Sequence, residues 1–456
     1  MILVPINPAT GKRLRSHPAT SAAALERLLC AADRARTAWG ATPLPDRAAC
    51  LEALARELRA RRDELADLVA VEMGKPVAQG RAEVEKSAGL CDYYARHGAA
   101  LLGDERPPGA PATARVAFAP LGTVLAIMPW NFPFWQVVRA AVPALIAGNT
   151  VLVKPALNVP GCTAALAAAV RRAGFPRGVL QFALVDDRTA SALVGDPRVH
   201  GVTLTGSTRA GRAVAALAGA ALKPGVFELG GSDPALVLAD ADLDRAAELG
   251  ATARLLNSGQ SCVCAKRFLV ERAVLEEFTA RLVARLAARR VGDPRDPATD
   301  VGPLARADLR DTLAAQVRRS VRLGARVALG GAARPGPGWF FEPTVLTGVR
   351  PGMPAFDEEL FGPVAAVVAV RDADDAVRLA NRSRYGLGAS VYTRDAARGA
   401  AVARALEAGS VFINDFVRSS AELPFGGVKD SGYGRELGAW GARAFVNVKT
   451  VVAAVG

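Results

Sequence analysis

The sequence predicts an α/β protein in which two parallel sheets, each covered by helices, follow one another along the chain. Short apolar runs alternate with alanine-rich helical segments, which is the pattern of βαβ units on a parallel sheet. This alternation occurs once before Glu228 and again after it, so we expect two α/β units with a cleft between them. The length of 456 residues, 51% of them hydrophobic, is sufficient for two or three domains with substantial cores.

The first unit opens with a helical region, residues 21–99, in which Pro43 and Pro45 mark a break. After it, strands are predicted at 123–127, 150–153, 179–182 and 199–204, and helices at 134–147, 161–173 and 209–220. In the second unit, strands are predicted at 235–238, 268–270, 364–370, 390–392 and 411–414, and helices at 243–256 and 275–290. Two β-like segments, 114–118 and 444–454, fit neither sheet, so we expect them to pair with each other or with another subunit.

The formal net charge of +13 makes nucleic acid the first partner to consider. The basic excess is spread over both halves of the chain, and its densest spots, around Arg61 and Arg319, carry no interleaved aromatic residues. A surface that binds nucleic acid by stacking combines clustered charge with aromatic side chains. We therefore interpret the arginines as solvated helix faces and expect no nucleic-acid partner.

The six cysteines form no Cys-x-x-Cys pair, and the three histidines lie far apart in the sequence. This pattern predicts neither a disulfide framework nor a metal site, and it favours a reducing, cytoplasmic location. Met1–Arg13 lacks the pattern of a signal peptide. The uncharged stretch Val116–Val138 is long enough to span a bilayer, but its prolines and polar residues would break a membrane helix. We expect this stretch to be buried within the protein and no association with a membrane.

The most informative cluster is the polar turn Asn257–Cys264, which follows a predicted helix and reads Asn-Ser-Gly-Gln-Ser-Cys-Val-Cys. Cys262 in this turn is a candidate nucleophile, and on the local sequence alone a structural cysteine remains the alternative. The other four cysteines outside the cluster lie in Ala/Leu-rich helical contexts and are expected to be small core residues: Cys30, Cys50, Cys91 and Cys162.

Two further residues have the chemistry to assist a nucleophile. Glu228 opens the turn Glu-Leu-Gly-Gly at the end of a predicted strand, where desolvation raises the pKa of a carboxyl group toward that of a general base. Asn131 is held between two prolines in Pro-Trp-Asn-Phe-Pro, and its amide can donate a hydrogen bond to an oxyanion. Taken singly, each has a structural alternative: a helix cap or surface carboxylate for Glu228, and a buried turn for Asn131.

Taken together, these motifs resemble the aldehyde dehydrogenase superfamily. The motifs around Asn131, Glu228 and Cys262 stand in the family's order, together with Thr205-Gly206-Ser207, Glu-Leu-Phe-Gly-Pro at 359–363 and Pro-Phe-Gly-Gly-Val-Lys-Asp-Ser-Gly at 424–432. The resemblance implies a Rossmann-like cofactor domain, an α/β catalytic domain and a small β oligomerisation element of a dimer or tetramer. Their implied limits are residues 1–103 and 120–229, residues 230–425, and residues 104–119 and 436–456, respectively.

The resemblance also implies a role for each of these residues. Cys262, as a thiolate, attacks the aldehyde carbon, and Asn131 and the Cys262 backbone N–H stabilise the resulting oxyanion. Glu228 activates the water that releases the acid. No Gly-x-Gly-x-x-Gly fingerprint is present, so the NAD or NADP site rests on the resemblance alone. The implied cofactor-binding residues are Trp130, Lys154, Gly206, Ser207, Gly211, Glu359 and Phe361.

Position 157 bears on the choice of coenzyme. Many NAD-preferring relatives carry a glutamate three residues beyond Lys154 that binds the ribose hydroxyls, whereas this chain has Leu157. Without that carboxylate a 2′-phosphate is not repelled, although no additional serine or arginine demands one. The expected coenzyme is NAD or NADP, with a slight preference for NADP.

Within the family, the chain resembles the short bacterial succinate-semialdehyde dehydrogenases. Arg139 ends the uncharged stretch, and in those enzymes an arginine at this place binds the substrate carboxylate; a structural salt bridge is the alternative. Ser419 and Ser420 resemble the serine-bearing loop that offers a second carboxylate contact. Leu256 replaces a second substrate-binding arginine of some relatives, so a broader aldehyde range stays open.

Cys264 forms a Cys-x-Cys pair with Cys262. In some succinate-semialdehyde dehydrogenases such a pair oxidises to an inhibitory disulfide, so Cys264 is a candidate redox partner; a small strand residue is the alternative. The residues fit two rival functions less well than they fit a dehydrogenase. A cysteine hydrolase or acyltransferase needs a Cys–His pair, and no histidine lies in a comparable motif. A non-enzymatic scaffold has no chemical reason to keep all of the reactive residues.

Overall fold

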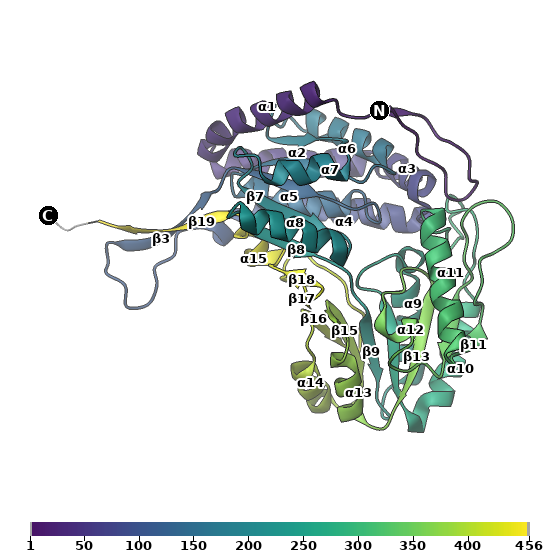
Figure 1. Ribbon diagram of the computed structural model, residues 1–456. Helices are drawn as coiled ribbons and strands as arrows, with labels where there is room; N and C mark the ends of the chain where they lie inside the picture. Colours follow the sequence, from purple (N-terminus) through teal and green to yellow (C-terminus); the bar gives the residue numbers. More distant parts are fainter. Residues whose placement is uncertain (1, 454–456) are drawn as a thin grey trace.

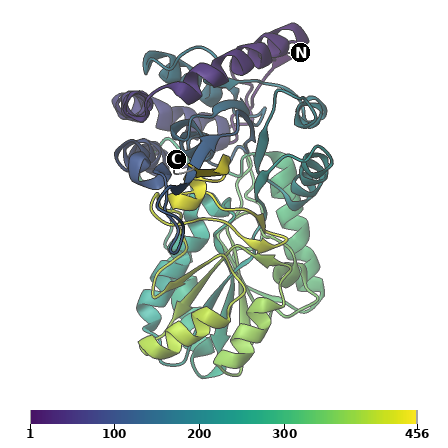
Figure 2. The ribbon, with the colours of Figure 1, turned by 90° about the vertical axis from the view of Figure 1, so that its left-hand side faces the viewer.

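The computed structural model describes residues 2–453 and contains two large sheets, one in each half of the molecule (Figure 1). The view in Figure 2 shows the first unit above and the strands of the second unit fanned out below it. Helices cover both sheets. The predicted α/β class, with two successive parallel sheets, is confirmed.

The first sheet contains five parallel strands and one short antiparallel strand. The parallel strands are β4 (Thr123–Ile127), β5 (Thr150–Lys154), β6 (Leu180–Phe182), β7 (Gly201–Thr205) and β8 (Gly225–Glu228), and the antiparallel one is β18 (Gly432–Tyr433). The helices between them are α5 (Trp135–Ile146), α6 (Pro160–Arg172), α7 (Asp187–Val194) and α8 (Thr208–Ala220). The order β18-β8-β7-β4-β5-β6 reverses direction between β4 and β7. At such a switch point the carboxyl ends of the strands form a crevice that binds ligands.

The second sheet has the order β11-β12-β13-β10-β9-β15-β16, parallel except at β11. Its strands are β9 (Asp233–Val237), β10 (Ala265–Glu271), β11 (Arg326–Leu329), β12 (Thr344–Thr347), β13 (Val364–Val370), β15 (Gly388–Tyr392) and β16 (Ser410–Ile413). Its helices are α9 (Leu243–Leu255), η1 (Leu256–Gly259), η2 (Arg272–Val274), α10 (Leu275–Ala287), α11 (Ala307–Arg322), α12 (Pro354–Asp357), α13 (Ala373–Asn381) and α14 (Ala396–Ala405). Glu228 therefore ends the last parallel strand of the first sheet, five residues before the second sheet begins.

The remaining elements cover the first unit or join the two units. The predicted N-terminal helical region forms four helices, and the break marked by the prolines falls between the first two. The elements are β1 (Ile2–Leu3), β2 (His17–Pro18), α1 (Ala22–Ala41), α2 (Leu44–Ala60), α3 (Arg62–Met73), α4 (Val77–Leu102), β14 (Tyr385–Gly386), β17 (Val428–Lys429) and α15 (Gly438–Ala442).

The two β-like segments outside the sheets pair with each other. Strand β3 (Ala114–Pro120) runs antiparallel to β19 (Val446–Val452) along its whole length. Figure 1 shows this two-stranded arm projecting from the body of the molecule. Residues 454–456, the end of the implied oligomerisation element, lie outside the described residues.

The uncharged stretch 116–138 is buried for most of its length. It contributes β4 to the centre of the first sheet and the first turn of α5, whose twelve residues are all buried. Among the described residues, no helix combines the length and the apolar character needed to cross a membrane.

The cysteines outside the reactive cluster divide into two kinds. Cys91 and Cys162 are fully buried, as predicted. The prediction is wrong for Cys30 and Cys50, which are only half-buried. Cys30 lies at the surface within 3.4 Å of the Arg198 guanidinium, and Cys50 packs at the edge of the core. Alanine-rich helices have edges as well as buried faces, and composition alone does not separate them.

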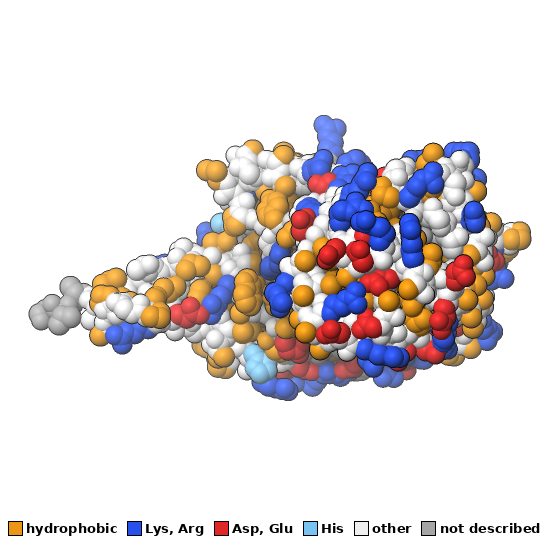
Figure 3. Space-filling view, turned by 90° about the horizontal axis from the view of Figure 1, so that it is seen from below, with side chains coloured by type: hydrophobic (Ala, Val, Ile, Leu, Met, Phe, Trp, Pro, Cys, Tyr) orange, Lys and Arg blue, Asp and Glu red, His pale blue; other side chains and the backbone are white. Residues whose placement is uncertain are grey.

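Acidic and basic side chains are interspersed on the face shown in Figure 3. Many arginines are ion-paired at the surface; Arg59, for example, contacts both Glu85 and Asp92. Such exposed pairs contribute little to stability, but they neutralise much of the local field.

Candidate active site

The turn that carries Cys262 has an unusual backbone. Asn257, Ser258 and Gly259 all adopt left-handed conformations, with φ values of 54°, 55° and 78°. A Cβ on Gly259 would lie 2.3 Å from the Gly362 backbone, so only glycine fits there. The fully buried Arg254 donates to the carbonyl oxygens of Gly259 and Gly362, at 2.7 Å each. The turn is thereby fixed against the Glu-Leu-Phe-Gly-Pro motif.

Asn131 is tied to the same turn by two hydrogen bonds. Its Nδ2 donates to the carbonyl of Gln260 at 3.0 Å, and Asn257 Nδ2 donates to the Asn131 carbonyl at 2.7 Å. An amide nitrogen carries two hydrogens, so one N–H of Asn131 remains for an oxyanion beside Cys262. The structure therefore brings Asn131 and Cys262 together, although 131 residues separate them in sequence.

Glu228 is buried at the end of β8, and neither carboxylate oxygen has a hydrogen-bond partner. Burial, reinforced by the neighbouring Glu436 carboxylate, raises the pKa of Glu228 well above its usual range, and the Arg139 charge opposes this shift. A Cβ on Gly426 would lie 2.6 Å from Glu228 Oε1, so the Pro-Phe-Gly-Gly motif packs directly on this carboxyl group. The raised pKa makes the Glu228 carboxylate a stronger proton acceptor than an exposed one, as a general base requires.

The two glycines after Glu228 pack closely against the nucleophile segment, whereas Glu228 itself is not among the residues that line either cavity at Cys262. A Cβ on Gly231 would lie 2.6 Å from the Cys262 carbonyl oxygen, and one on Gly230 would lie 2.7 Å from Glu359 Oε2. Gly231 N–H donates to Glu359 Oε1 at 3.1 Å. Lys266 Nζ donates to the Cys262 carbonyl at 2.7 Å and lies 3.5 Å from Glu359 Oε1. Close backbone contacts thus join the Glu-Leu-Gly-Gly turn to the segment that carries Cys262.

The thiol of Cys262 is half-buried, and desolvation raises its pKa to about 12, while Arg139 and Lys266 act in the opposite direction. At neutral pH the thiol is protonated, so attack requires a group that accepts its proton. Cys264 is buried, with its Sγ 3.5 Å from the Leu256 carbonyl oxygen.

One cavity extends from Cys262 to the switch point of the first sheet. Six of the seven predicted cofactor residues line it: Trp130, Lys154, Gly206, Ser207, Glu359 and Phe361. Trp130 and Phe361 meet edge to face, with 5.8 Å between ring centroids. The seventh, Gly211, is not among the lining residues. A Cβ there would lie 2.3 Å from Leu229, so this glycine lets α8 pack closely on the strand-ending turn.

The donors along this cavity fit a dinucleotide. Ser207 caps α8 by accepting a hydrogen bond from Ala210 N–H at 3.2 Å, and the other N–H groups of the first turn have no partner within the helix. A helix start of this kind binds phosphate. Lys154 stands at the far end, paired with the exposed Asp187 at 2.7 Å.

A second cavity meets the first at Cys262 and Gln136. Its wall is formed by α4, α5, the nucleophile turn and the chain after β16. The lining residues are Gln79, Ala82, Glu83, Lys86, Phe132, Trp135, Gln136, Arg139, Leu256, Ser261, Cys262, Val263, Phe416, Arg418, Ser419 and Phe425. Of the three predicted substrate residues, Arg139 and Ser419 are present and Ser420 is not.

Arg139 is committed to contacts within the protein. Its guanidinium pairs with the buried Glu436 at 2.5 Å, donates to Thr205 Oγ1 at 3.2 Å and lies over the Phe425 ring. The salt bridge considered as an alternative from the sequence is therefore present, on a residue that also lines the cavity.

Several lining residues escaped the sequence analysis. Gln79, Glu83 and Lys86 are spaced i, i+4 and i+7, so one face of α4 points at the cavity; this periodicity was an available signal. Glu436 had no local signal, because it reaches Arg139 through an antiparallel bridge to Phe425.

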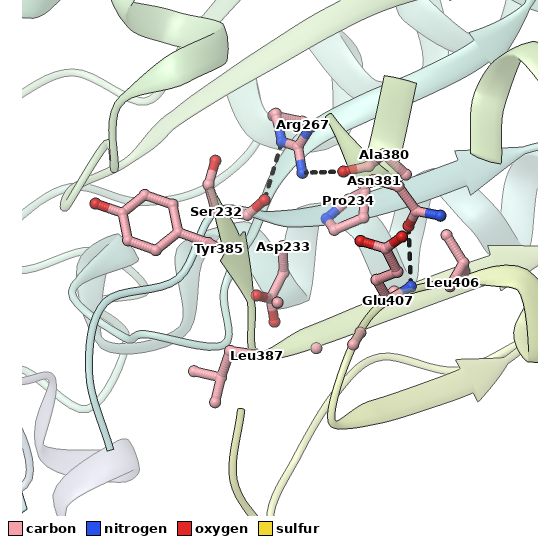
Figure 4. Close-up of a pocket in the computed structure, with 14 residues that line it drawn as sticks. Ser232, Asp233, Pro234, Arg267, Ala380, Asn381, Tyr385, Leu387, Leu406 and Glu407 are labelled. Carbon is pink, nitrogen blue, oxygen red and sulfur yellow. Dashed lines mark hydrogen bonds between the residues drawn. The ribbon is translucent and has the colours of Figure 1, made fainter. Parts of the chain in front are cut away.

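A smaller pocket lies beside the Gly230–Gly231 turn, at the start of β9 (Figure 4). Asp233 is buried there, which raises its pKa to about 7 against the opposing charge of Lys266. Arg267 donates to the Ser232 carbonyl at 2.9 Å and to the Ala380 carbonyl at 3.2 Å. These contacts anchor the crossing from the first sheet to the second.

A thiol, an amide donor and a buried carboxyl group between two α/β units are the groups that covalent thiol catalysis requires. The adjoining phosphate-binding helix start places the protein among the dinucleotide-dependent enzymes. The chain matches the model of the aldehyde dehydrogenase family over residues 3–451 and belongs to that family.

Four of the similar proteins are named for the same substrate, succinate semialdehyde. The chain is 48% identical over 448 residues to the succinate semialdehyde dehydrogenase Sad of Escherichia coli K12, covering 98% of this chain and 97% of that protein. It is 46% identical over 454 residues to the NADP(+) succinate-semialdehyde dehydrogenase 1 of Mycobacterium tuberculosis H37Rv, covering 99% of each. The NADP+ complex of succinic semialdehyde dehydrogenase from Streptococcus pyogenes superposes with a TM-score of 0.96 at 34% identity, covering 99% of each chain. The Burkholderia pseudomallei succinate-semialdehyde dehydrogenase gives 0.96 at 36%, covering 100% of this chain and 95% of that one.

Proposed function

We propose that the protein oxidises succinate semialdehyde to succinate with NADP or NAD as hydride acceptor. The observation that carries this proposal is the meeting of two cavities at Cys262, one with a phosphate-binding helix start and the other with cationic side chains. The similar proteins named for this substrate support it. An aldehyde dehydrogenase of broader range is the second candidate, because Leu256 leaves an apolar patch in the substrate cavity.

The reaction begins at Cys262. Its thiol first gives up its proton to solvent in the cavity; the thiolate then attacks the aldehyde carbon, and the developing oxyanion receives hydrogen bonds from the free N–H of Asn131 and from the Cys262 backbone N–H. Lys266 holds the Cys262 carbonyl and so keeps this peptide oriented. When bound in the cavity lined by Trp130, Glu359 and Phe361, a nicotinamide coenzyme would supply the hydride acceptor for this chemistry, and Cys262 would then carry the acyl group as a thioester.

Glu228 then takes a proton from the water that attacks the thioester carbon. Its buried position excludes other partners, and the Arg139 charge favours the ionised form needed at that moment. Burial, reinforced by the Glu436 carboxylate, raises the pKa of Glu228 and so strengthens it as a proton acceptor. Because both reactive groups act in their deprotonated forms, the rate rises with pH through the neutral range.

Steady-state rates with four substrate–coenzyme pairs test the proposed function. Succinate semialdehyde and butanal, which have equal chain lengths, are each assayed with NAD and with NADP by absorbance of the reduced coenzyme. We expect the highest kcat/KM with succinate semialdehyde, and a modest preference for NADP, because Leu157 presents no carboxylate to a 2′-phosphate. Equal kcat/KM for both aldehydes would favour the broad-range alternative.

The assembly and the division into domains follow from the same proposal. We assign residues 1–103 and 120–229 to coenzyme binding, 230–425 to catalysis, and 104–119 with 436–456 to oligomerisation as a dimer or tetramer in the cytoplasm. The projecting β3–β19 arm supports the last assignment, since it exposes Val448 and Val452 beyond the body of the molecule. Sedimentation velocity of the purified protein measures the assembly.

Replacing Asn131 by alanine is expected to lower kcat by about 10²–10³-fold, because one oxyanion donor is lost. KM for the aldehyde should change little, since the donor acts on charge that develops after binding. The Asn131→Asp variant places a negative charge beside the oxyanion, so its kcat should be at least as low as that of Asn131→Ala. A loss confined to KM would instead assign Asn131 to substrate binding.

We also propose Cys264 as a redox partner of Cys262. Hydrogen peroxide would oxidise the two thiols to a disulfide and be reduced to water, and dithiothreitol would restore both thiols. Cys264 lies two residues from Cys262, but closing the bond requires the buried Sγ to leave the Leu256 carbonyl. We expect inactivation by peroxide to be reversible in the wild type and irreversible in Cys264→Ala. Equal recovery of the two proteins would eliminate this role.

A further inference from the structure

Lys86 is an unpaired cation on the wall of the substrate cavity. It projects from α4, and its Nζ donates to Ser419 Oγ at 2.9 Å and lies 4.2 Å from the centroid of the Trp135 ring. Within residues 2–453, no carboxylate lies within ion-pair distance of this ammonium group; its neighbours are a hydroxyl and an aromatic face. A lysine in this setting has a vacant place for an anion.

The other cations of the cavity are already neutralised. Arg139 is paired with the buried Glu436, and Arg418 is paired with Asp415 at 2.7 Å. An arginine that keeps its ion pair has less charge to offer a second carboxylate. Lys86 is therefore the cation best able to form a new ion pair in this cavity.

The one carboxylate that lines the cavity is also committed elsewhere. Glu83 lies one turn before Lys86 but forms a buried ion pair with Lys75. Its Oε1 also accepts hydrogen bonds from the backbone N–H groups of Phe134 and Trp135, at 2.9 and 3.0 Å. Glu83 thus fixes the start of α5 and leaves the Lys86 ammonium free.

We propose that Lys86, together with Ser419, binds the carboxylate of the aldehyde substrate and makes the enzyme specific for an anionic aldehyde. This inference rests on the proposed function and identifies the residues behind its substrate preference. The carboxylate accepts hydrogen bonds from the lysine ammonium and the serine hydroxyl, while the substrate's methylene groups pass along the aromatic wall toward Cys262. Lys86 then supplies the positive charge that is missing at position 256, where this chain has Leu256 in place of the arginine of some relatives.

The charges around Lys86 make this contact sensitive to pH. Part of the Lys86 side chain is exposed to solvent, but desolvation within the cavity together with the positive charges of Arg139 and Arg418 lowers its pKa to about 8, against the opposing effects of Glu83 and Cys262. The free enzyme therefore loses the Lys86 charge as the pH rises through about 8. A bound carboxylate favours the charged form, so binding of the anionic substrate weakens above that pH.

The test compares Lys86→Met and Lys86→Arg with the wild type on succinate semialdehyde and butanal. For Lys86→Met we expect kcat/KM for succinate semialdehyde to fall by about 10- to 100-fold, mostly through KM, because a charged hydrogen bond is lost. Butanal, which has no carboxylate, should react at the wild-type rate. Lys86→Arg should retain most of the preference, and Lys12→Met, at an exposed surface lysine, should leave both substrates unchanged.

The ratio of the two kcat/KM values against pH provides a second readout. The titrations of Cys262 and Glu228 affect both aldehydes and cancel in this ratio. In the wild type the ratio should fall as the pH rises through about 8, and in Lys86→Arg the fall should disappear. A wild type that prefers succinate semialdehyde and a Lys86→Met variant that keeps this preference would overturn the role of Lys86. A wild type without the preference would instead refute the proposed function itself.

Discussion

Replacing Cys262 by alanine should abolish aldehyde oxidation, with kcat lowered by at least about 10⁴-fold. No other group in the two cavities combines a nucleophilic atom with the adjoining N–H of Asn131, so no residue can substitute for the sulfur. The loss is measured as formation of reduced coenzyme with succinate semialdehyde. Hydrolysis of an ester substrate, which needs the thiol but no hydride transfer, should be lost in the same variant.

The neighbouring thiol offers a matched control for this experiment. Cys264→Ala removes a buried sulfur two residues away and should keep kcat within about threefold, because its Sγ faces the Leu256 carbonyl. Coenzyme binding, followed by quenching of protein fluorescence, should survive in both variants. If Cys262→Ala kept more than about 1% of the wild-type rate, covalent catalysis through this residue would be refuted.

Replacing Glu228 by glutamine should lower steady-state kcat by about 10²–10⁴-fold while leaving the first turnover intact. The glutamine cannot accept a proton from water, so the thioester accumulates on Cys262. Rapid mixing should show a burst of about one reduced coenzyme per active site, followed by a slow steady phase. If the burst were lost as well, Glu228 would be acting on the thiol rather than on the water.

The same substitution should stabilise the protein, by an amount that grows as the pH rises. The pKa of Glu228 is higher in the folded protein than in the unfolded chain, so the folded state holds the proton more tightly. The free energy of unfolding therefore falls as the pH rises above about 4.5, where the unfolded carboxyl group ionises. Glu228→Gln removes this penalty.

We expect the variant to be more stable than the wild type at pH 8 and nearly equal to it at pH 4.5. Urea denaturation of both proteins at the two pH values measures the difference. A variant that is less stable than the wild type at pH 8 would show that the Glu228 carboxylate is favourably paired in the folded protein.

The reactive residues were predictable because each lies in a short segment with distinctive backbone chemistry. Asn131 stands between prolines, Glu228 precedes two glycines, and Cys262 follows a polar turn. The structure gives the reason, since contacts between backbones join these segments and a larger residue at Gly231 would displace the Cys262 carbonyl. The same glycines, prolines and polar residues that mark these segments in the sequence also build the site.

The environment of Arg139 shows where sequence reasoning reaches its limit. The expectation that a buried arginine must meet an anion is correct, but the anion present in the structure is the protein's own Glu436. These residues are nearly 300 positions apart, and only the fold brings them together. Lys86 was missed for a related reason: α4 reads as an ordinary amphipathic helix, and which of its faces meets Ser419 depends on packing.

The secondary structure was predicted well where elements are buried. Strands 123–127 and 364–370 have the predicted limits, because both are apolar runs bounded by turn residues. The wide N-terminal helical region gave less detail, since its four helices share one composition and the boundary between α2 and α3, at Arg61, carries no strong local signal.

The two cavities that meet at Cys262 and Gln136 have a consequence for inhibitor chemistry. A single small molecule can carry an anionic group for the substrate cavity and an aromatic amide for the coenzyme cavity. An electrophile between them would lie at the junction, beside the Cys262 sulfur. Anchoring at both ends would hold the reactive carbon in place before the covalent bond forms. Selectivity would then come from the distance between the anchors, which depends on the positions of α4 and α8 relative to the thiol.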